Sequence, residues 1–297
     1  MARRNSGIAS SGIGLLNRKP WNSSQRVWCR YCAKLGEAFV EGHIKVDGPV
    51  DEVFRVATGL ATAVSKTTRA GFHFFKPHSR SADRKAIEYH YDVSNDFYRM
   101  VLDPGMVYSC AYYLDEADTF EQAQVNKLDH IRNKLMVKPG ERLLDIGCGW
   151  GSLILRAAGK YGAIAHGITA NDADSRWMGL GAGEFIGRYV FPEGELPHIS
   201  RVQREMALAR LEVTDVESLR RHYARTCDAW PHKLEANRDR ACEIAGDKRY
   251  RIWQIYLAGC ASGFANGWMN LCQLRACKSE NAGARQLPMT REYMYRW

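Results

Sequence analysis

The clearest pattern of hydrophobic and polar positions lies in the middle of the chain. A short apolar strand is predicted at 142–146, and a glycine-rich loop and a helix at 152–160 follow it. Gly162 then interrupts the chain, and a second strand is predicted at 163–168. Such a β-loop-α-β unit needs about 30 residues, which this segment supplies. The pattern therefore predicts one unit of a parallel α/β sheet.

The segments before this unit predict helices and a linker. Helical spacing at 120–137 follows Asp118 or Thr119 as a possible cap and stops at a Lys-Pro-Gly turn. Residues 34–65 are predicted to form a small unit. In it, 34–48 alternate polar and apolar positions into a turn, and 51–64 show helical spacing with Asp51 as a possible cap. Residues 66–86 are basic and irregular, as in a linker.

The β-α alternation stops after Thr169. Residues 171–185 are polar and glycine-rich, and the chain from 184 onward predicts helices with two strand candidates, at 211–216 and 268–276. With 297 residues, the chain can hold one large domain or two ordinary ones. We predict a poorly ordered arm at 1–33, a small unit with its linker at 34–80, and an α/β domain at 81–297.

Charge and cysteine content narrow the class of protein. Lys and Arg exceed Asp and Glu by 42 to 33, a net charge of +9 that favours an anionic partner or else a solvated basic surface. No run approaches the roughly 20 apolar residues that span a bilayer. Nine irregularly spaced cysteines favour a reduced, cytoplasmic protein, and Cys29 and Cys32 form a lone CxxC without a second ligand pair.

Two constellations carry candidate chemistry. The loop Asp145–Gly151 reads DIGCGWG at the exit of a strand, where glycines allow a tight turn and the close approach of a nucleoside. GxGxG spacing suits S-adenosylmethionine (SAM) better than a dinucleotide, although a structural turn is the alternative. Asp172 or Asp174 lies near the distance expected for a ribose-binding acid. The aromatic stretch ending in Tyr108-Ser109-Cys110 could line a sulfonium site or belong to the core.

Five motifs in order resemble the cyclopropane-fatty-acyl-phospholipid and mycolic-acid cyclopropane synthases. They are EYHYDVSNDFYRMVLDPGMVYSCAYY, LLDIGCGWG, RYVFPEGELPHI, HYARTCDAW and YLAGCASGF. The resemblance implies a Rossmann-like SAM-dependent methyltransferase fold with added helices. It also implies transfer from SAM to a cis double bond of a phospholipid acyl chain, with bicarbonate accepting a proton as the ring closes.

The resemblance also implies roles for residues of this chain. Expected bicarbonate contacts are Cys110, Tyr223, His166 and Ile168. Cys260 matches a cysteine described as an active-site residue. Because a carbocation route needs no covalent nucleophile, a thiol that packs between helices is the favoured interpretation of Cys260. Expected SAM contacts are Tyr108, Ser109, Leu143, Leu144, Asp145, Ile146, Gly147, Cys148, Gly149, Trp150 and Gly151. No metal site is expected.

The domain is predicted to be truncated by an internal deletion after about residue 169. The segment between Thr169 and RYVFP, about 20 residues, is shorter than one β-α-β unit. In addition, no Phe-Glu-His motif occurs in the sequence. The family sheet order is 3-2-1-4-5-7-6. We therefore expect the strand at 163–168 to insert between the strands at 143–146 and 269–275, giving one four-stranded sheet, because unpaired central backbone groups are costly.

Three functions follow as hypotheses. The first is a cyclopropane synthase, or related lipid C-methyltransferase, acting on unsaturated phospholipid at the inner face of the membrane, with basic clusters at its surface. The second is a catalytically impaired remnant that binds a membrane or a partner. The third, a nucleic-acid methyltransferase, lacks a base-holding N-P-P-[YF] motif, so nucleic acid is not an expected partner. A homodimer is compatible with each.

Overall fold

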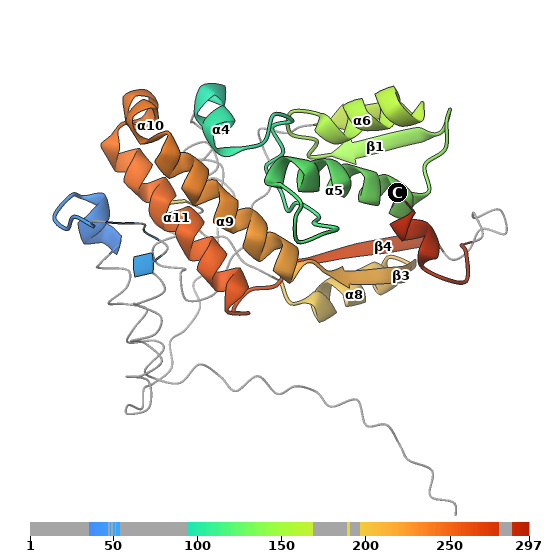
Figure 1. The fold of residues 1–297 in the computed structure, drawn as a ribbon. Helices are drawn as coiled ribbons and strands as arrows, with labels where there is room; N and C mark the ends of the chain where they lie inside the picture. Colours follow the sequence, from blue (N-terminus) through green and yellow to red (C-terminus); the bar gives the residue numbers. More distant parts are fainter. Residues whose placement is uncertain are drawn as a thin grey trace, which may run out of the picture.

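Two small sheets and a group of packed helices make up the described part of the chain (Figure 1). The computed structural model describes residues 36–46, 48, 50, 52–53, 94–168, 189–190, 197–278 and 287–296. The elements in chain order are α4 (Asn95–Val101), α5 (Phe120–Leu135), β1 (Arg142–Ile146), α6 (Ser152–Tyr161), β2 (Ile164–Ile168), α8 (Ile199–Leu208), β3 (Leu211–Ser218), α9 (Arg220–Ala236), α10 (Arg238–Ala245), α11 (Asp247–Ala265), β4 (Cys272–Lys278) and the 3-10 helix η1 (Glu292–Tyr295).

The predicted β-loop-α-β unit is present as β1, α6 and β2. The two strands pair in parallel, with Leu144 opposite His166 and Ile146 opposite Ile168. One face of this sheet packs on α6, where Ala157 lies in a small apolar cluster with Leu143 and other residues. Burial alternates along β1 accordingly, as expected for a sheet covered on one side.

The predicted four-stranded sheet is wrong. Among the described residues, β2 pairs only with β1, whereas β4 pairs in antiparallel register with β3 in a second sheet of two strands. The short connection through α6 places β2 beside β1, because consecutive elements are usually adjacent in space. The pairing of β4 with β3 satisfies one edge of β4 and leaves β2 at an outer edge.

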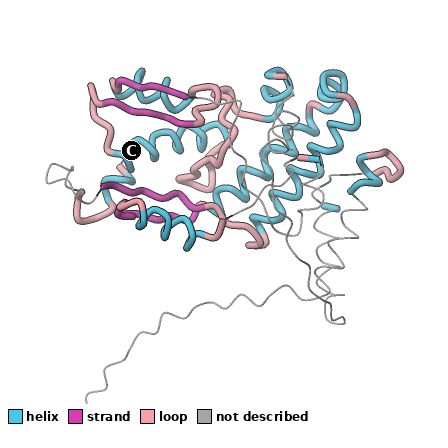
Figure 2. The backbone as a smooth tube through the Cα atoms, turned by 180° about the vertical axis from the view of Figure 1, so that it is seen from behind, coloured by secondary structure: helices cyan, strands magenta, loops and turns pink. Residues whose placement is uncertain are grey.

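Helix α5 lies between the two sheets in both views of the molecule (Figures 1 and 2). On one side, Asp129 forms ion pairs with Arg156 and Lys160 of α6, at 2.5 and 3.0 Å. On the other side, Lys134 contacts Asp215 and Glu217 of β3, at 3.0 and 2.5 Å. This helix, rather than a central strand, therefore connects the two sheets.

The main core is formed by α9 and α11 together with α4 and the segment after it. Phe97, Trp230 and Trp253 are each at most 3% exposed, and Leu257 is fully buried. Tilted and edge-to-face aromatic contacts, such as Phe97 with Trp253 at 5.3 Å, are typical of such cores. This aromatic core borders the loop that follows β1.

Other local predictions have mixed outcomes. Thr119 is the cap of α5, accepting a hydrogen bond from the Gln122 N–H, and the helix ends two residues early because Met136 adopts a left-handed φ of 55°. Residues 36–40 are helical rather than extended. The predictions for Asp51, the basic linker, the CxxC pair and the ribose-binding acids lie outside the described residues. No helix in the described ranges has the length and apolar character to cross a membrane.

Candidate functional site

The glycine loop after β1 presents bare backbone on its open side. Gly147, Gly149 and Gly151 have φ angles of 83°, 53° and 88°, which residues with a Cβ rarely adopt. A Cβ added to Gly147 or Gly149 would meet no atom within 4 Å. The Gly147 N–H donates to the carbonyl oxygen of Ile168 at 2.6 Å, which ties the loop to β2. No side chain of the described residues fills the space beside Gly147 and Gly149.

Aromatic rings connect this loop to the segment before α5. The ring of Trp150 lies 5.2 Å from that of Tyr98, and Tyr98 lies 5.6 Å from Tyr108. The indole N–H of Trp150 donates to Asn95 Oδ1 at 3.1 Å. The Ser152 hydroxyl also donates to the carbonyl oxygen of Gly105. Tyr108 and Trp150 therefore belong to one row of aromatic rings, the aromatic wall, which begins at the loop with Trp150 and continues into the main core at Tyr108.

Hydrogen bonds fix the backbone that carries Tyr108, Ser109 and Cys110. The carboxylate of Asp103 accepts hydrogen bonds from the N–H groups of Gly105 and Val107, both at 2.8 Å. The amide of Gln124 donates to the carbonyl oxygen of Ser109 at 3.0 Å. These contacts orient the Ser109 side chain toward Lys127 of α5, whose Nζ donates to Ser109 Oγ at 2.9 Å.

The predicted residues Cys110, Tyr223 and Cys260 are brought together in the core. Burial raises the pKa of the Cys110 thiol and of the Cys260 thiol to about 12. Tyr223 packs its ring 4.6 Å from that of Phe264. Both thiols are therefore protonated at neutral pH, and neither is a nucleophile, because the reactive form is the thiolate. This agrees with the interpretation of Cys260 as a packing thiol.

His166 and Ile168 lie apart from this group. Their side chains point to the face of the β1–β2 sheet that also carries Leu144 and Ile146, because these residues are register partners. That face is open: Ile146 is 77% exposed and Ile168 is 52% exposed. The opposite face carries Asp145, which interacts electrostatically with Lys127. The structure therefore does not gather all four predicted bicarbonate contacts.

Lys127 is a residue of this region that the sequence motifs do not indicate. Its side chain is buried, with 7% exposure, and it interacts with Ser109 and electrostatically with Asp103, Cys110 and Asp145. Burial lowers the pKa of Lys127 to about 8. The only signal in the sequence is the spacing of Gln124 and Lys127, which places two polar residues on a helix face that packs inward.

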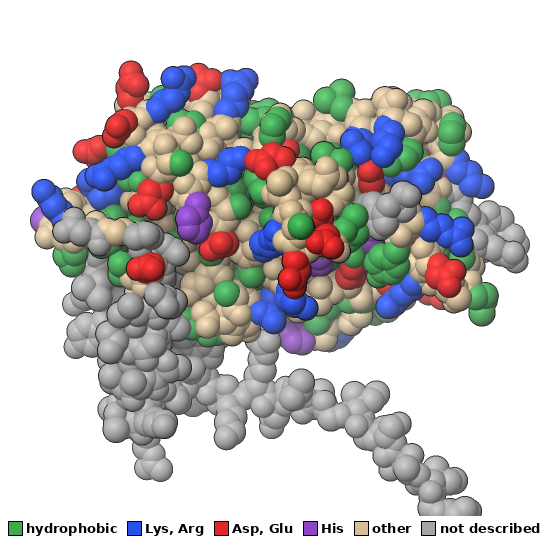
Figure 3. All heavy atoms as spheres, viewed as in Figure 1, with side chains coloured by type: hydrophobic (Ala, Val, Ile, Leu, Met, Phe, Trp, Pro, Cys, Tyr) green, Lys and Arg blue, Asp and Glu red, His purple; other side chains and the backbone are tan. Residues whose placement is uncertain are grey.

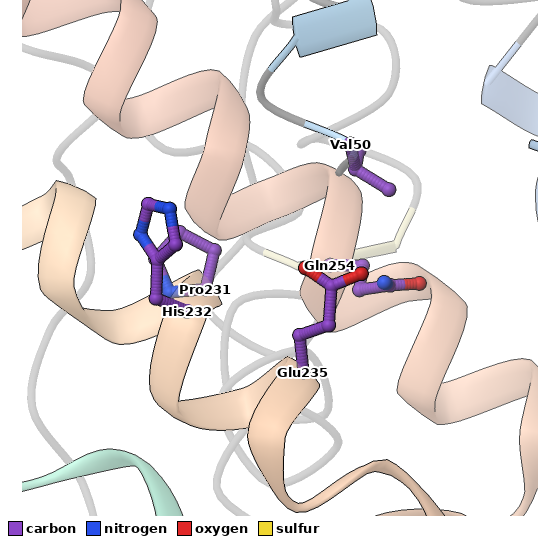
Figure 4. A pocket seen from close by; sticks show the side chains of 5 residues that line it. All are labelled: Val50, Pro231, His232, Glu235 and Gln254. Carbon is purple, nitrogen blue, oxygen red and sulfur yellow. The ribbon is translucent and has the colours of Figure 1, made fainter. Parts of the chain in front are cut away.

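A small hollow lies elsewhere, at the junction of α9 and α11 (Figure 4). Its lining includes His232 and Glu235 of α9 and Gln254 of α11, together with Val50 and Pro231. None of the predicted site residues lines it. The candidate site is the open side of the glycine loop together with the aromatic wall. Bare backbone and aromatic rings are groups that can bind a sulfonium nucleoside.

Known proteins resemble this chain in sequence. The family model described as mycolic acid cyclopropane synthetase matches residues 78–179 and 164–274. A probable fatty acid methyltransferase of Pseudomonas putida is 37% identical over 341 residues, covering 89% of this chain and 86% of that protein. Cyclopropane mycolic acid synthase 1 of Mycobacterium tuberculosis is 29% identical, covering 68% of this chain and 98% of that protein.

A solved structure agrees with these relatives. The mycolic acid cyclopropane synthase CmaA1, complexed with SAH and CTAB, superposes with a TM-score of 0.59 at 27% identity, over 69% of this chain and 99% of that chain. The fold and the loop thus define an α/β protein of the SAM-dependent methyltransferase class. Within that class, the chain belongs to the mycolic acid cyclopropane synthetase family.

Proposed function

We propose that this protein transfers a one-carbon unit from SAM to the cis double bond of an unsaturated phospholipid acyl chain. The observation that carries the proposal is the bare glycine loop joined to the aromatic wall through Trp150 and Tyr98. The relatives support it, because one is described as a fatty acid methyltransferase and another was solved with SAH, the demethylated form of SAM.

Each part of the site would have a separate task. SAM would supply the transferable methyl group on a sulfonium. The backbone of Gly147 and Gly149 would lie against the nucleoside, and the Tyr108 ring would face the positive sulfur, which gains roughly 0.5 to 2 kcal/mol over an aromatic face. Bicarbonate would contact Cys110 and Tyr223. For His166 and Ile168 to join them, the open sheet face would have to turn toward the core.

The basic surplus supports an anionic membrane surface as the place of action. The net charge is +9, and each Lys or Arg near such a surface contributes about 1 kcal/mol. In the face shown in Figure 3, however, acidic and basic side chains are interspersed. Binding to anionic vesicles should therefore be weak and should fall when the salt concentration is raised.

The second candidate, a catalytically impaired remnant, rests on different observations. The match to the Pseudomonas putida protein runs over 341 residues, more than the 297 of this chain, so it leaves gaps in this chain. The two family-model matches overlap at 164–179, as expected if one segment stands for two parts of the family sequence. The described strands form two separate pairs. These features support the internal deletion inferred from the sequence.

Calorimetric titration with SAH separates the two candidates in a first step. Micromolar binding supports the enzyme, and absence of heat at millimolar SAH supports the remnant. In a second step, the protein is incubated with methyl-labelled SAM and vesicles of monounsaturated phosphatidylglycerol, with saturated vesicles as the control. Label in the fatty acids of the unsaturated vesicles alone supports the transfer. SAH binding without label transfer rejects the enzymatic function.

A further inference from the structure

Lys127 is a buried cation with few partners in the part of the chain that the structure describes. Its Nζ donates one hydrogen bond, to Ser109 Oγ at 2.9 Å, although an ammonium carries three donors. Among the described residues, no carboxylate lies within 4.0 Å of Nζ. A buried ammonium is costly unless an anion or further acceptors compensate it. Among the described residues, Lys127 therefore has fewer compensating groups than a buried ammonium needs, and an anionic ligand would supply the missing one.

The titratable groups around Lys127 are Asp103, Cys110 and Asp145. Asp103 comes from the segment before Tyr108, and its carboxylate already accepts hydrogen bonds from the N–H groups of Gly105 and Val107. Cys110 carries a protonated thiol. Asp145 is the last residue but one of β1, just before the glycine loop, and burial raises its pKa. None of these groups supplies Lys127 with a close counterion.

Lys127 also interacts with two residues expected to contact the cofactor. It donates a hydrogen bond to Ser109 and interacts electrostatically with Asp145. A site with one ammonium and one carboxylate matches the amino-acid end of SAM, which carries one carboxylate and one ammonium. Bicarbonate has only the anionic half of that pattern, so Asp145 would repel it.

We propose that Lys127 binds the carboxylate at the amino-acid end of SAM, while Asp145 faces the ammonium of the same group. The inference rests on the proposed function, because it names a specificity residue of that site. Lys127 is a binding residue rather than a catalytic one. A charge-assisted hydrogen bond of this kind sets affinity and selects against a nucleoside that lacks the carboxylate.

The test compares Lys127→Met with Lys138→Met, which removes an exposed lysine just beyond α5. The probes are SAH and its descarboxy analogue, with affinity measured by calorimetry. We expect Lys127→Met to weaken SAH binding roughly 10- to 100-fold and to leave the affinity for the analogue unchanged. Lys138→Met should change neither affinity. Lys127→Arg should keep part of the affinity. Thermal unfolding without ligand should show that Lys127→Met is no less stable, because a buried charge is removed.

The pH dependence gives a second readout. Because the ammonium form is needed, SAH affinity should fall as the pH rises through about 8 in the wild type. The fall should be smaller in Lys127→Met, in which only the amino group of SAH still titrates. Equal SAH affinities in the wild type and Lys127→Met would overturn the assignment. If bicarbonate raises the Tm of the wild type but not of Lys127→Met, and the two proteins bind SAH equally, then Lys127 binds bicarbonate and not the SAM carboxylate.

The proposed function can fail separately. If the wild type binds no SAH, the proposed function is rejected. Thermal unfolding with acetate then tests whether Lys127 binds a carboxylate at all. A rise in Tm with acetate in the wild type and Lys138→Met, but not in Lys127→Met, keeps Lys127 as a carboxylate site. The same response in all three proteins overturns it.

Discussion

At the residue scale, the glycine loop allows the sharpest prediction. Gly147→Ala places a methyl group in the open space beside the loop and should cost roughly 1 kcal/mol of stability through its positive φ. Gly140 has a similar φ of 78° and equally open surroundings but lies in the turn after α5. We expect both alanine variants to lower Tm alike and only Gly147→Ala to abolish SAH binding in calorimetry. Equal SAH affinity in the two variants would contradict the role of the loop.

The thiol of Cys260 gives a second prediction. Because burial raises its pKa to about 12, Cys260 should serve packing rather than chemistry. Cys260→Ala should lower the free energy of unfolding by roughly 1 kcal/mol and leave SAH affinity and label transfer within twofold of the wild type. Denaturant unfolding and the vesicle assay measure the two effects. A hundredfold loss of transfer in a folded variant would make the thiol catalytic.

Residue patterns predicted the loop but not its buried lysine. The glycines and the strand before them form a pattern within a few residues, so the sequence predicts them. Lys127 looks like any surface lysine of an amphipathic helix. Its surroundings include Ser109 of the segment at 103–110 and Asp145 of β1, both far from it in the sequence.

At the element scale, α5 is held by charged side chains on both sides. Burial opposes the ionisation of Glu217, but hydrogen bonds from His130 and Lys134 outweigh it and lower the pKa of Glu217 to about 2. Tyr112 donates a further hydrogen bond to this carboxylate at 2.9 Å. His130 also contacts the carbonyl oxygen of Met294, so the network reaches the C-terminal segment.

This network predicts a dependence of stability on acid. The pKa of Glu217 in the folded protein lies below its ordinary 4.5, so its stabilisation is complete above about pH 4.5 and is lost as the pH falls toward about 2. Glu217→Gln should therefore lower the free energy of unfolding at pH 7 by roughly 1 to 3 kcal/mol, and Tm with it. Between pH 4.5 and 2, Tm should depend less on pH in the variant than in the wild type. Calorimetric scans across that range measure both effects. An unchanged slope in the variant would show that other carboxylates dominate.

At the scale of the whole molecule, the division into two sheets leaves apolar side chains in water. Leu144, Ile146, Ile164 and Ile168 share one face of the β1–β2 sheet and are each more than half exposed. Contiguous exposed apolar residues on a sheet with open edges favour association. The division thus has a direct consequence for solution behaviour.

We expect the protein to associate in a concentration-dependent way through this face. Replacing Ile146 and Ile164 together by Lys should shift sedimentation velocity profiles toward the monomer. Leu155→Lys is the matched control, because Leu155 is 70% exposed but lies on helix α6. If the control disperses the protein as well as the double variant does, general charge rather than the sheet face is responsible.

The sequence by itself determined the cap of α5 at Thr119 or its neighbour, the β1-α6-β2 unit and the glycine loop, since each depends on neighbours a few residues away. It also determined the family, through motifs spread over most of the chain. Only the tertiary structure decided that β2 stays beside β1 alone, that α5 separates the two sheets, and that His166 faces away from Cys110. These features depend on contacts between residues far apart in the chain. Several strands or helices can then pack against the same partner, and the local sequence does not determine which of them does.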